Sequence, residues 1–334
     1  MRVAVVWNHD DAGVINRFGN PCQEEYGRET VERTVAALQE GGHEALLCEG
    51  DKGLLATLEQ FMPPDPLARP SGIVFNMAAG IQGECRLTHI PAMLEMAGVP
   101  YTGSSPLGHG LALDKVIAKR LIRDLGVPTP KFRVMRRGTE STGDLRFPVV
   151  VKPRHESVSC GLQLIREPAK LRHAVEVIVT QYAQDALVEE YIEGREIYVA
   201  LLGNGDLDVL PLVEQEFGDR EPRLTTWEDK QRMAVAAPQA ICPAQIDSKI
   251  ATVLRDISIA TFHACECLDH ARVDLRIDRS GRPFVLEINS MPGLSANSFY
   301  PMAARAAGHS FSSLVNRMLD VAHMRYFGIG IPSD

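Results

Sequence analysis

Two short apolar runs near the end of the sequence carry polar side chains at alternate positions. Arg272 and Asp274 lie in the first run, Glu287 and Asn289 lie in the second, and Ser280-Gly281 lies between them. If the runs pair as an antiparallel hairpin around a two-residue turn, Asp274 faces Glu287 and Arg272 faces Asn289. The two-residue repeat of a strand then places all four side chains on one face.

This arrangement suits a divalent cation. Carboxylates that face each other across two strands destabilise a sheet, so Asp274 and Glu287 need a positive charge between them. Carboxylate and amide oxygens suit Mg²⁺, which usually completes its coordination with substrate phosphates. A turn longer by one residue would break this register, and the alternative is a solvated face with unrelated charges. The register also predicts an opposite, apolar face formed by Val273, Leu275, Leu286 and Ile288.

Two lysines stand next to segments predicted to be buried, and either could bind a phosphate. Lys152 closes the apolar run 147–152, and Lys115 follows Leu113-Asp114. The small, polar segment 153–161 could fold over phosphates with its backbone N–H groups, although it is no Walker A motif. The alternative for each lysine is a surface residue whose stem packs on apolar neighbours.

The elements that position these residues follow from hydrophobic periodicity. The first hundred residues alternate strands (3–7, 44–48, 72–77 and 99–102) with helices (25–40 and 88–97), which predicts a parallel sheet with helices on its faces. The remainder mixes helices (111–125, 171–182, 247–263 and 310–326) with hairpins (196–213 and 272–289). The polar stretch 214–233 has no periodicity and is predicted to be a mobile loop. The expected fold class is α/β, with α+β character in the central and C-terminal parts.

Composition excludes several classes of protein. The 334 residues are 45% hydrophobic and 23% charged, which is typical of a globular chain. A net charge of −8 argues against a nucleic-acid partner, whose binding depends on positive charge. The seven cysteines form no CxxC pair, which favours reduced thiols. The sequence shows neither a cleavable leader nor the ~20 apolar residues of a membrane span, so we expect a cytoplasmic protein.

Taken in order, several short motifs resemble the ATP-grasp superfamily, and most closely the D-alanine–D-alanine ligase family. The resemblance covers nearly the whole chain. It is carried by Phe75-Asn76 with Gly83-Glu84, by 100–104, 113–115, 151–153 with 156–161, 188–196 and 272–274, and most specifically by 286–294. It implies an ATP-grasp fold that follows an N-terminal Rossmann-like domain. The implied domains are 1–104, 105–194 and 195–334.

In such ligases ATP lies between the central and C-terminal sheets. By this resemblance, Lys115, Lys152 and the loop residue Lys230 would contact the phosphates. Adenine would be held by Glu189 and by the backbone near Tyr191 and Ile192. Glu196 would bind the ribose. By the same resemblance, two Mg²⁺ ions, with Mn²⁺ as an alternative, would be held by Asp274, Glu287 and Asn289.

The resemblance also implies catalytic and substrate-binding residues. Arg272 and the backbone N–H of Gly293 would stabilise the tetrahedral oxyanion, a role that preorganised donors perform. Lys230 would reach the γ-phosphate when its loop closes. Glu25 matches the family's carboxylate that pairs with the ammonium of the first substrate. Ser298 matches the family's serine that binds the carboxylate of the second substrate.

Five positions depart from the family pattern. Ala79 replaces a histidine, Val158 a serine, Gln231 a tyrosine and Phe299 a leucine, and Arg86 stands where a small residue is usual. Valine has no hydrogen-bonding group, so the family's network between the loop and the first-substrate pocket cannot form in the same way. Two interpretations of Arg86 remain: it meets a second carboxylate on an unusual substrate, or it forms a surface salt bridge.

The resemblance implies an ATP-dependent carboxylate–amine ligase that joins two amino acids through an acyl phosphate and releases ADP and phosphate. Its partners would be small amino-acid substrates, without nucleic acid or membrane, and the protein would be a homodimer. The family's setting is peptidoglycan synthesis in cell-wall biogenesis. The alternatives are an amino-acid ligase of different specificity in specialised metabolism, and a non-catalytic ATP-binding relative.

Overall fold

The structure is a computed structural model that describes residues 1–9, 14–16, 22, 26–230 and 238–328. Its N-terminal part is a parallel sheet in the order β2-β1-β3, formed by β1 (Arg2–Trp7), β2 (Glu44–Glu49) and β3 (Gly72–Asn76). The helices of this part are α1 (Arg28–Glu40), α2 (Leu54–Phe61), the short η1 (Arg86–Thr88) and α3 (His89–Ala97). The predicted parallel sheet is confirmed, and Val74 bridges Tyr101 at its edge.

The central part is an antiparallel sheet reached through two helices. Its strands are β4 (Phe132–Met135), β5 (Val149–Pro153), β6 (Gln163–Ile165) and β7 (Ala186–Glu190), in the order β4-β7-β5-β6, and α6 (Pro168–Tyr182) packs on it. The single helix expected at 111–125 is wrong: α4 (Pro106–Leu113) and α5 (Lys115–Asp124) are separate. The carboxylate of Asp114 accepts hydrogen bonds from the N–H groups of Val116 and Ile117, at 3.0 and 3.1 Å, which caps a new helix.

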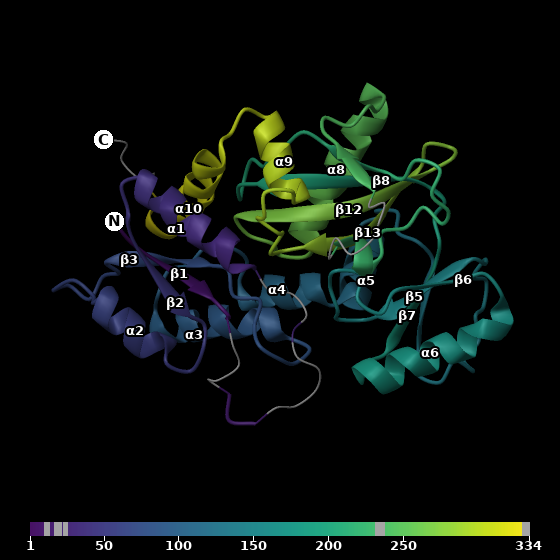
Figure 1. The fold of residues 1–334 in the computed structure, drawn as a ribbon, viewed down its shortest axis with the longest axis horizontal. Helices are drawn as coiled ribbons and strands as arrows, with labels where there is room; N and C mark the ends of the chain where they lie inside the picture. The colour runs from purple at the N-terminus through teal and green to yellow at the C-terminus, as the bar shows by residue number, and fades with distance from the viewer. Residues whose placement is uncertain (10–13, 17–21, 23–25, 231–237, 329–334) are drawn as a thin grey trace.

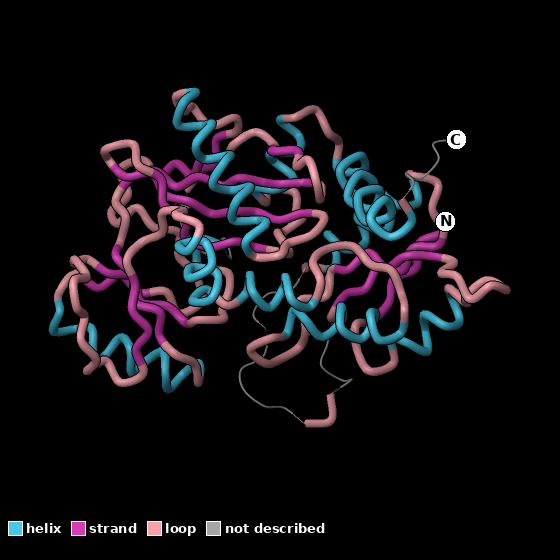
Figure 2. Tube along the Cα trace, turned by 180° about the vertical axis from the view of Figure 1, so that it is seen from behind, coloured by secondary structure: helices cyan, strands magenta, loops and turns pink. Residues whose placement is uncertain are grey.

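The C-terminal part is built on the largest sheet. Its order is β11-β10-β8-β12-β13, with β9 paired to β8. The strands are β8 (Gly194–Leu202), β9 (Asp208–Val209), β10 (Val213–Glu216), β11 (Gln239–Ile241), β12 (His270–Asp278) and β13 (Pro283–Asn289), and the helices are α7 (Trp227–Lys230), α8 (Ser248–Ala264) and α9 (Phe299–Ala306). From behind, a long helix, α8, crosses the strands of this sheet (Figure 2). The loop predicted at 214–233 is wrong for its first residues, because Glu214–Glu216 belongs to β10, which pairs with β8 and β11.

The hairpin of β12 and β13 keeps its expected register by an unexpected route. The turn is one residue longer than predicted, since Ile277 pairs with Pro283 and Asp278 donates its N–H to the carbonyl of Arg282. A β-bulge between the pairs Asp274/Glu287 and Leu275/Val285 then restores the register. Leu286 is the extra residue, and it lines a cavity beside Glu287 instead of the apolar face that we predicted.

The last helix, α10 (Phe311–Phe327), packs beside α1 of the N-terminal part and beside α9. Figure 1 shows α10 beside α1. The two helices share one buried core with β1 and β3, whose members include Val5, Phe75, Leu314, Met318 and Leu319. The side-chain amide of Asn316 donates to the carbonyl of Ala37 at 2.8 Å.

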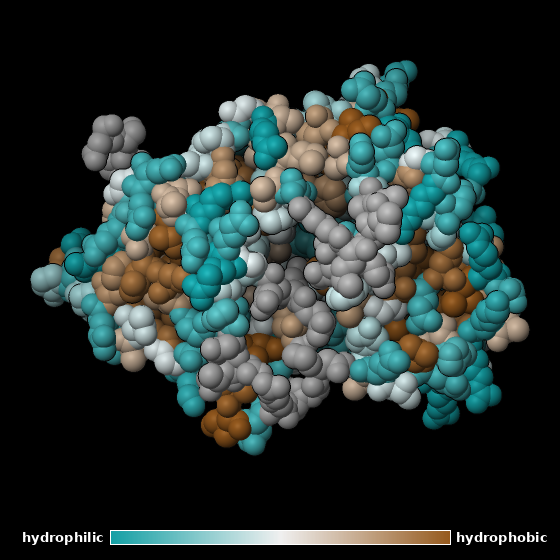
Figure 3. Space-filling model, viewed as in Figure 1, coloured by the Kyte–Doolittle hydropathy of each residue, from teal (hydrophilic) through white to brown (hydrophobic). Residues whose placement is uncertain are grey.

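The outer surface carries mainly polar side chains. Figure 3 shows hydrophilic residues over most of one face, with apolar patches between them. Among the helices in the described part of the chain, none combines the length and apolarity needed to cross a bilayer.

Two buried histidines lie where the N-terminal and C-terminal parts meet. Burial lowers the pKa of His109 to about 3 and that of His270 to about 4. The ordinary value is 6.5, so below this pH the unfolded chain takes up protons that the folded chain refuses. Each histidine therefore stabilises the fold fully above pH 6.5, and this contribution falls as the pH drops toward its own lowered pKa.

We expect the free energy of unfolding to fall by about 1.4 kcal/mol per pH unit for each histidine between about pH 6 and pH 4. Denaturant unfolding at a series of pH values measures this slope. His270→Gln should flatten it, whereas the exposed His263→Gln should not. Equal slopes for both variants and the parent protein would contradict the assignment.

Candidate active site

Residues from five elements meet in a small cavity between the central and C-terminal sheets. Lys115 begins α5, Lys152 lies on β5, Glu196 lies on β8, Asp274 lies on β12 and Glu287 lies on β13. We call this space the lysine cavity; its other lining residues include Tyr198, Thr225 and Leu286. Five of the residues predicted from sequence thus meet at one place. The cavity holds only about 60 Å³, less than the roughly 300–1,000 Å³ usual for a small-molecule pocket.

Lysines and carboxylates alternate in this cavity. The ammonium of Lys152 lies 2.7 Å from one oxygen of Glu189 and 3.9 Å from Glu287, and that of Lys115 lies 3.7 Å from Glu287. Burial opposes the charged form of Lys152, but the carboxylates of Glu189 and Glu287 outweigh it and raise its pKa. Lys115 also donates to the backbone carbonyl of Glu156. Both ammonium groups are therefore held next to the predicted metal ligands.

A third lysine, Lys119, was not predicted. It is 1% exposed, and its ammonium lies 2.8 Å from the second oxygen of Glu189 and donates to the hydroxyl of Thr129. Burial opposes ionisation of Glu189, but Lys119 and Lys152 lower its pKa. The i, i+4 spacing from Lys115 on α5 was the signal in the sequence, because it places both side chains on one helix face. Each oxygen of Glu189 therefore faces a lysine.

The metal-binding residues expected from the hairpin face one another. Asp274 pairs with Glu287 across the strands, as predicted. The two oxygens of Asp274 accept hydrogen bonds from Arg272 at 2.6 and 2.9 Å, and the amide of Asn289 donates to one of them at 3.2 Å. Two carboxylates and one amide oxygen fit Mg²⁺ when nucleotide phosphates supply further ligands. The described residues contain no cluster of three acidic, histidine or cysteine ligands that would hold a metal without phosphates.

A second cavity, of about 570 Å³, adjoins these groups. We call it the arginine cavity, and it is lined by Arg272, Asn289, Gly293, Ser298 and Phe299, together with Val158, Met291 and Met302. Thr225 lines both cavities, and its buried hydroxyl has no hydrogen-bond partner among the described residues. Its hydroxyl group therefore lies at the junction of the two cavities, and no sequence pattern predicted it.

Tyr191 and Ile192 are not brought into these cavities. They line a separate space of about 420 Å³, and the N–H of Tyr191 donates to the carbonyl of Pro148. Lys230 ends α7, but its side chain lies outside the described part of the structure. Glu25 and Gln231 also lie outside the described residues.

Arg86 is neither a surface residue nor a lining residue of the arginine cavity. It is 2% exposed, and its guanidinium contacts Glu156 at 3.5 Å, the carbonyl of His155 at 3.2 Å and the sulfur of Cys22 at 3.0 Å. The interpretation of Arg86 as part of a surface salt bridge is therefore wrong, because its ion pair with Glu156 is buried. Arg86 joins the N-terminal part to the segment 153–161 through His155 and Glu156. The side-chain amide of Gln184 also donates to Glu156, at 2.7 Å.

Arg86→Met should lower the free energy of unfolding by about 3–5 kcal/mol, because it leaves the buried carboxylate of Glu156 without its ion-pair partner. Thermal and denaturant unfolding measure the change. Arg136→Met is the matched control, since the ion pair of Arg136 with Asp185 is largely exposed and should contribute no more than about 1 kcal/mol. A similar small loss in both variants would show that Arg86 is not a structural tie.

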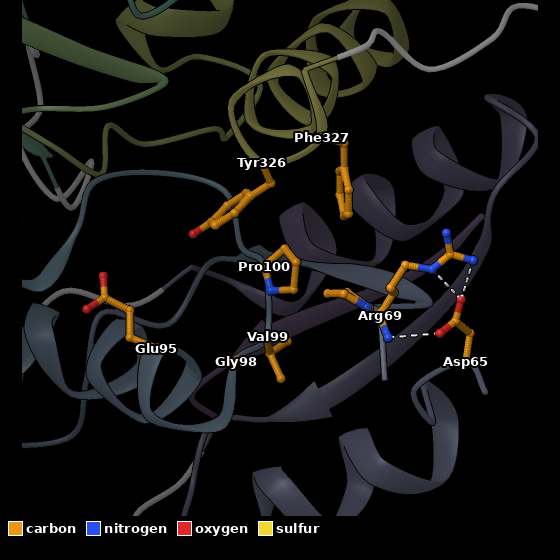
Figure 4. A pocket seen from close by; sticks show the side chains of 9 residues that line it. Asp65, Arg69, Glu95, Gly98, Val99, Pro100, Tyr326 and Phe327 are labelled. Atoms are coloured by element: carbon orange, nitrogen blue, oxygen red, sulfur yellow. Dashed lines mark hydrogen bonds and ion pairs between the residues drawn. The ribbon is translucent and has the colours of Figure 1, made fainter. Parts of the chain in front are cut away.

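A fourth cavity, of about 640 Å³, lies away from this chemistry. It is bounded by the C-terminal end of α3, the segment before β3 and the end of α10 (Figure 4). Its charged groups are already engaged: Asp65 binds Arg69 at 2.7 Å, and Glu95 accepts from the hydroxyl of Tyr101 at 2.7 Å. It therefore lacks the converging free polar groups of a catalytic site.

Comparison with known proteins agrees with this geometry. Residues 121–320 match the family described as D-ala D-ala ligase C-terminus. The chain is 70% identical over 336 residues to the uncharacterized protein y4sG of Sinorhizobium fredii, covering 99% of both chains. It is 34% identical to the D-alanine–D-alanine ligase of Bordetella pertussis, covering 86% of this chain and 90% of that one. The D-alanine–D-alanine ligase of Bacillus anthracis, solved with ATP, has the same fold, with a TM-score of 0.74 over 98% of both chains at 21% identity.

The family match and the ligase relatives show that this chain is an enzyme of the ligase class with an ATP-grasp fold. Within that class, the chain belongs to the D-alanine–D-alanine ligase family. The family and the fold expected from the sequence are thus both confirmed.

Proposed function

We propose that this protein is an ATP-dependent ligase that joins the carboxylate of one amino acid to the amine of another. The observation that carries this proposal is the junction of the two cavities. The lysine cavity offers cations and metal ligands for a nucleotide, and the arginine cavity offers Arg272, Gly293 and Ser298 for a carboxylate substrate. A phosphoryl group bound in the first would therefore lie next to an acyl group bound in the second.

The proposed reaction has two steps. A substrate carboxylate oxygen attacks the γ-phosphorus of ATP, the bond to ADP breaks, and an acyl phosphate forms. The amine of the second amino acid then attacks the acyl carbon, loses a proton, and phosphate leaves. Lys115 and Lys152 neutralise phosphate charge, and Arg272 with the N–H of Gly293 stabilises the oxyanion.

Mg²⁺ would be held by Asp274, Glu287 and Asn289, and it would offset the charge of the phosphates when bound. The two-ion stoichiometry and the alternative of Mn²⁺ remain predictions. Glu196 provides an acceptor for ribose hydroxyls. The role of Glu189 toward adenine stays a prediction from the resemblance, since Lys119 and Lys152 occupy its two oxygens. The hydroxyl of Tyr198 donates a hydrogen bond to the carboxylate of Glu196 at 2.5 Å. A bound ribose would therefore share this carboxylate with Tyr198.

Phosphate release tests the proposal. The protein is incubated with ATP, Mg²⁺ and pairs of D- or L-amino acids, and the coupled product is identified by mass spectrometry. We expect amino acids to stimulate phosphate release and a dipeptide-like product to appear. Release that no amino acid stimulates, together with tight ATP binding in calorimetry, would favour the non-catalytic alternative.

The wider assignments extend the same proposal. D-alanine as the substrate, action in peptidoglycan synthesis, a cytoplasmic location, a homodimer and domain boundaries near residues 104 and 194 are predictions from the resemblance. A ligase of different specificity is the second candidate. It is favoured by Val158 and Phe299, two departures from the family pattern that line the same cavity.

A further inference from the structure

The arginine cavity has an apolar part beside its catalytic groups. Its polar lining includes Arg272, Asn289, Ser298 and Asp229, whereas four separate segments supply apolar side chains. The apolar lining comes from the segment 153–161, β11, the segment after β13, and α9, and its side chains are Val158, Ala240, Met291, Phe299 and Met302. A volume of about 570 Å³ lies within the range of about 300–1,000 Å³ usual for small-molecule pockets.

Phe299 is fixed next to the proposed oxyanion site. Its ring stacks on Tyr198 with centroids 3.8 Å apart and an angle of 20° between the planes. Tyr198 is itself buried and bonded to Glu196, and the guanidinium of Arg272 lies 5.6 Å from the Phe299 ring. The ring is therefore a preformed apolar surface beside the group that would hold the reacting carbonyl.

Val158 lines the same cavity from a strained position. Its φ is +50°, in the left-handed region that β-branched residues rarely adopt. Such a conformation persists only where the surroundings hold it, and neighbouring Glu156 is anchored by Arg86 and Gln184. Glycine would fit this backbone without strain, so the valine places a branched apolar side chain in the cavity at the expense of local stability.

We propose, on the basis of the ligase function above, that one of the two joined amino acids has a branched or aromatic apolar side chain that contacts Val158 and Phe299. The methyl group of alanine is too small to cover both surfaces and the methionines around them. A longer apolar side chain removes more of this surface from water, which strengthens binding in proportion to the area covered.

The test compares amino acids in the full-length protein with Mg²⁺ and ATP. Phosphate release is measured with the D- and L-forms of alanine, valine, leucine and phenylalanine, and products are identified by mass spectrometry. We expect kcat/KM for at least one larger apolar amino acid to exceed that for alanine by at least about tenfold. Val158→Ser should lower this value about tenfold and change that for alanine less than about threefold.

Further variants separate substrate contact from a structural role. Val158→Gly relieves the strained φ and also removes the side chain, so it should show the same loss of preference in a protein at least as stable as the parent. Phe299→Leu should lower kcat/KM for phenylalanine more than kcat/KM for leucine. Val253→Ser, on the exposed side of α8, is the matched control and should change kcat/KM for neither amino acid.

The outcomes distinguish this inference from the function on which it rests. If alanine is the best substrate, or if Val158→Ser and Val158→Gly weaken all amino acids equally, the inference is wrong and the ligase function stands. If no amino acid stimulates phosphate release, both are wrong.

Discussion

Glu287→Gln is expected to abolish amino-acid-stimulated phosphate release, with a loss of at least about 10³-fold, while the protein remains folded. The neutral amide keeps the shape of the side chain but supplies no negative charge to a divalent ion. Substitution of a residue that only hydrogen-bonds to a metal ligand usually lowers activity roughly 10- to 100-fold. We expect a larger loss because Glu287 is a proposed ligand itself. Glu287 is 19% exposed, and Lys152 keeps Glu189 as its nearer partner at 2.7 Å, so the protein should remain folded.

Phosphate release, Mn²⁺ binding with ADP and thermal unfolding together check this expectation. Glu214→Gln is the matched control, because Glu214 lies on β10 of the same sheet and is similarly buried in an ion pair with Arg195, outside both cavities. It should keep the activity of the parent protein. Near-normal turnover in Glu287→Gln would mean that the metal site is misplaced.

Arg272→Lys is expected to lower kcat about 10²- to 10³-fold, with a smaller change in the KM for ATP. Lysine keeps the charge but loses the planar fork that binds both oxygens of Asp274, so the remaining donor cannot hold Asp274 and face the substrate together. The loss should appear in kcat because the proposed role of Arg272 is to stabilise charge that develops during reaction.

Steady-state phosphate release with the best amino-acid pair gives the two constants. Arg317→Lys, on α10 and outside both cavities, removes an exposed guanidinium that lies 3.4 Å from Asp208, and it should leave both constants unchanged. A KM effect without a kcat effect in Arg272→Lys would assign Arg272 to substrate binding alone.

Much of this site could be predicted from the sequence, because strand alternation and motif order fix which side chains share a face. Asp274 and Glu287 do face each other, although the prediction assumed the wrong turn. The longer turn and the bulge at Leu286 shift the strand pairing by one residue in opposite directions, so the register of Asp274 and Glu287 is unchanged. The hydrophobic pattern alone cannot reveal two shifts that cancel. The bulge also explains why Leu286 left the apolar face.

Other features depend on contacts between distant segments, which no local pattern encodes. Arg86 and Glu156 are 70 residues apart, and their ion pair exists only because two parts of the fold meet. Val158 could be recognised as a departure from the family, but its left-handed backbone could not be predicted from valine, which disfavours it. The break at Asp114 was predictable in principle, because aspartate is a common helix cap.

The position of α10 affects how the chain folds as it is made. Leu314, Met318 and Leu319 complete the core around Val5 and Phe75, yet they are translated more than two hundred residues later. On the ribosome, the β2-β1-β3 sheet therefore keeps part of an apolar surface open until α10 has been synthesised. A nascent chain that stops before residue 311 lacks this cover and would be a target for chaperones and proteases.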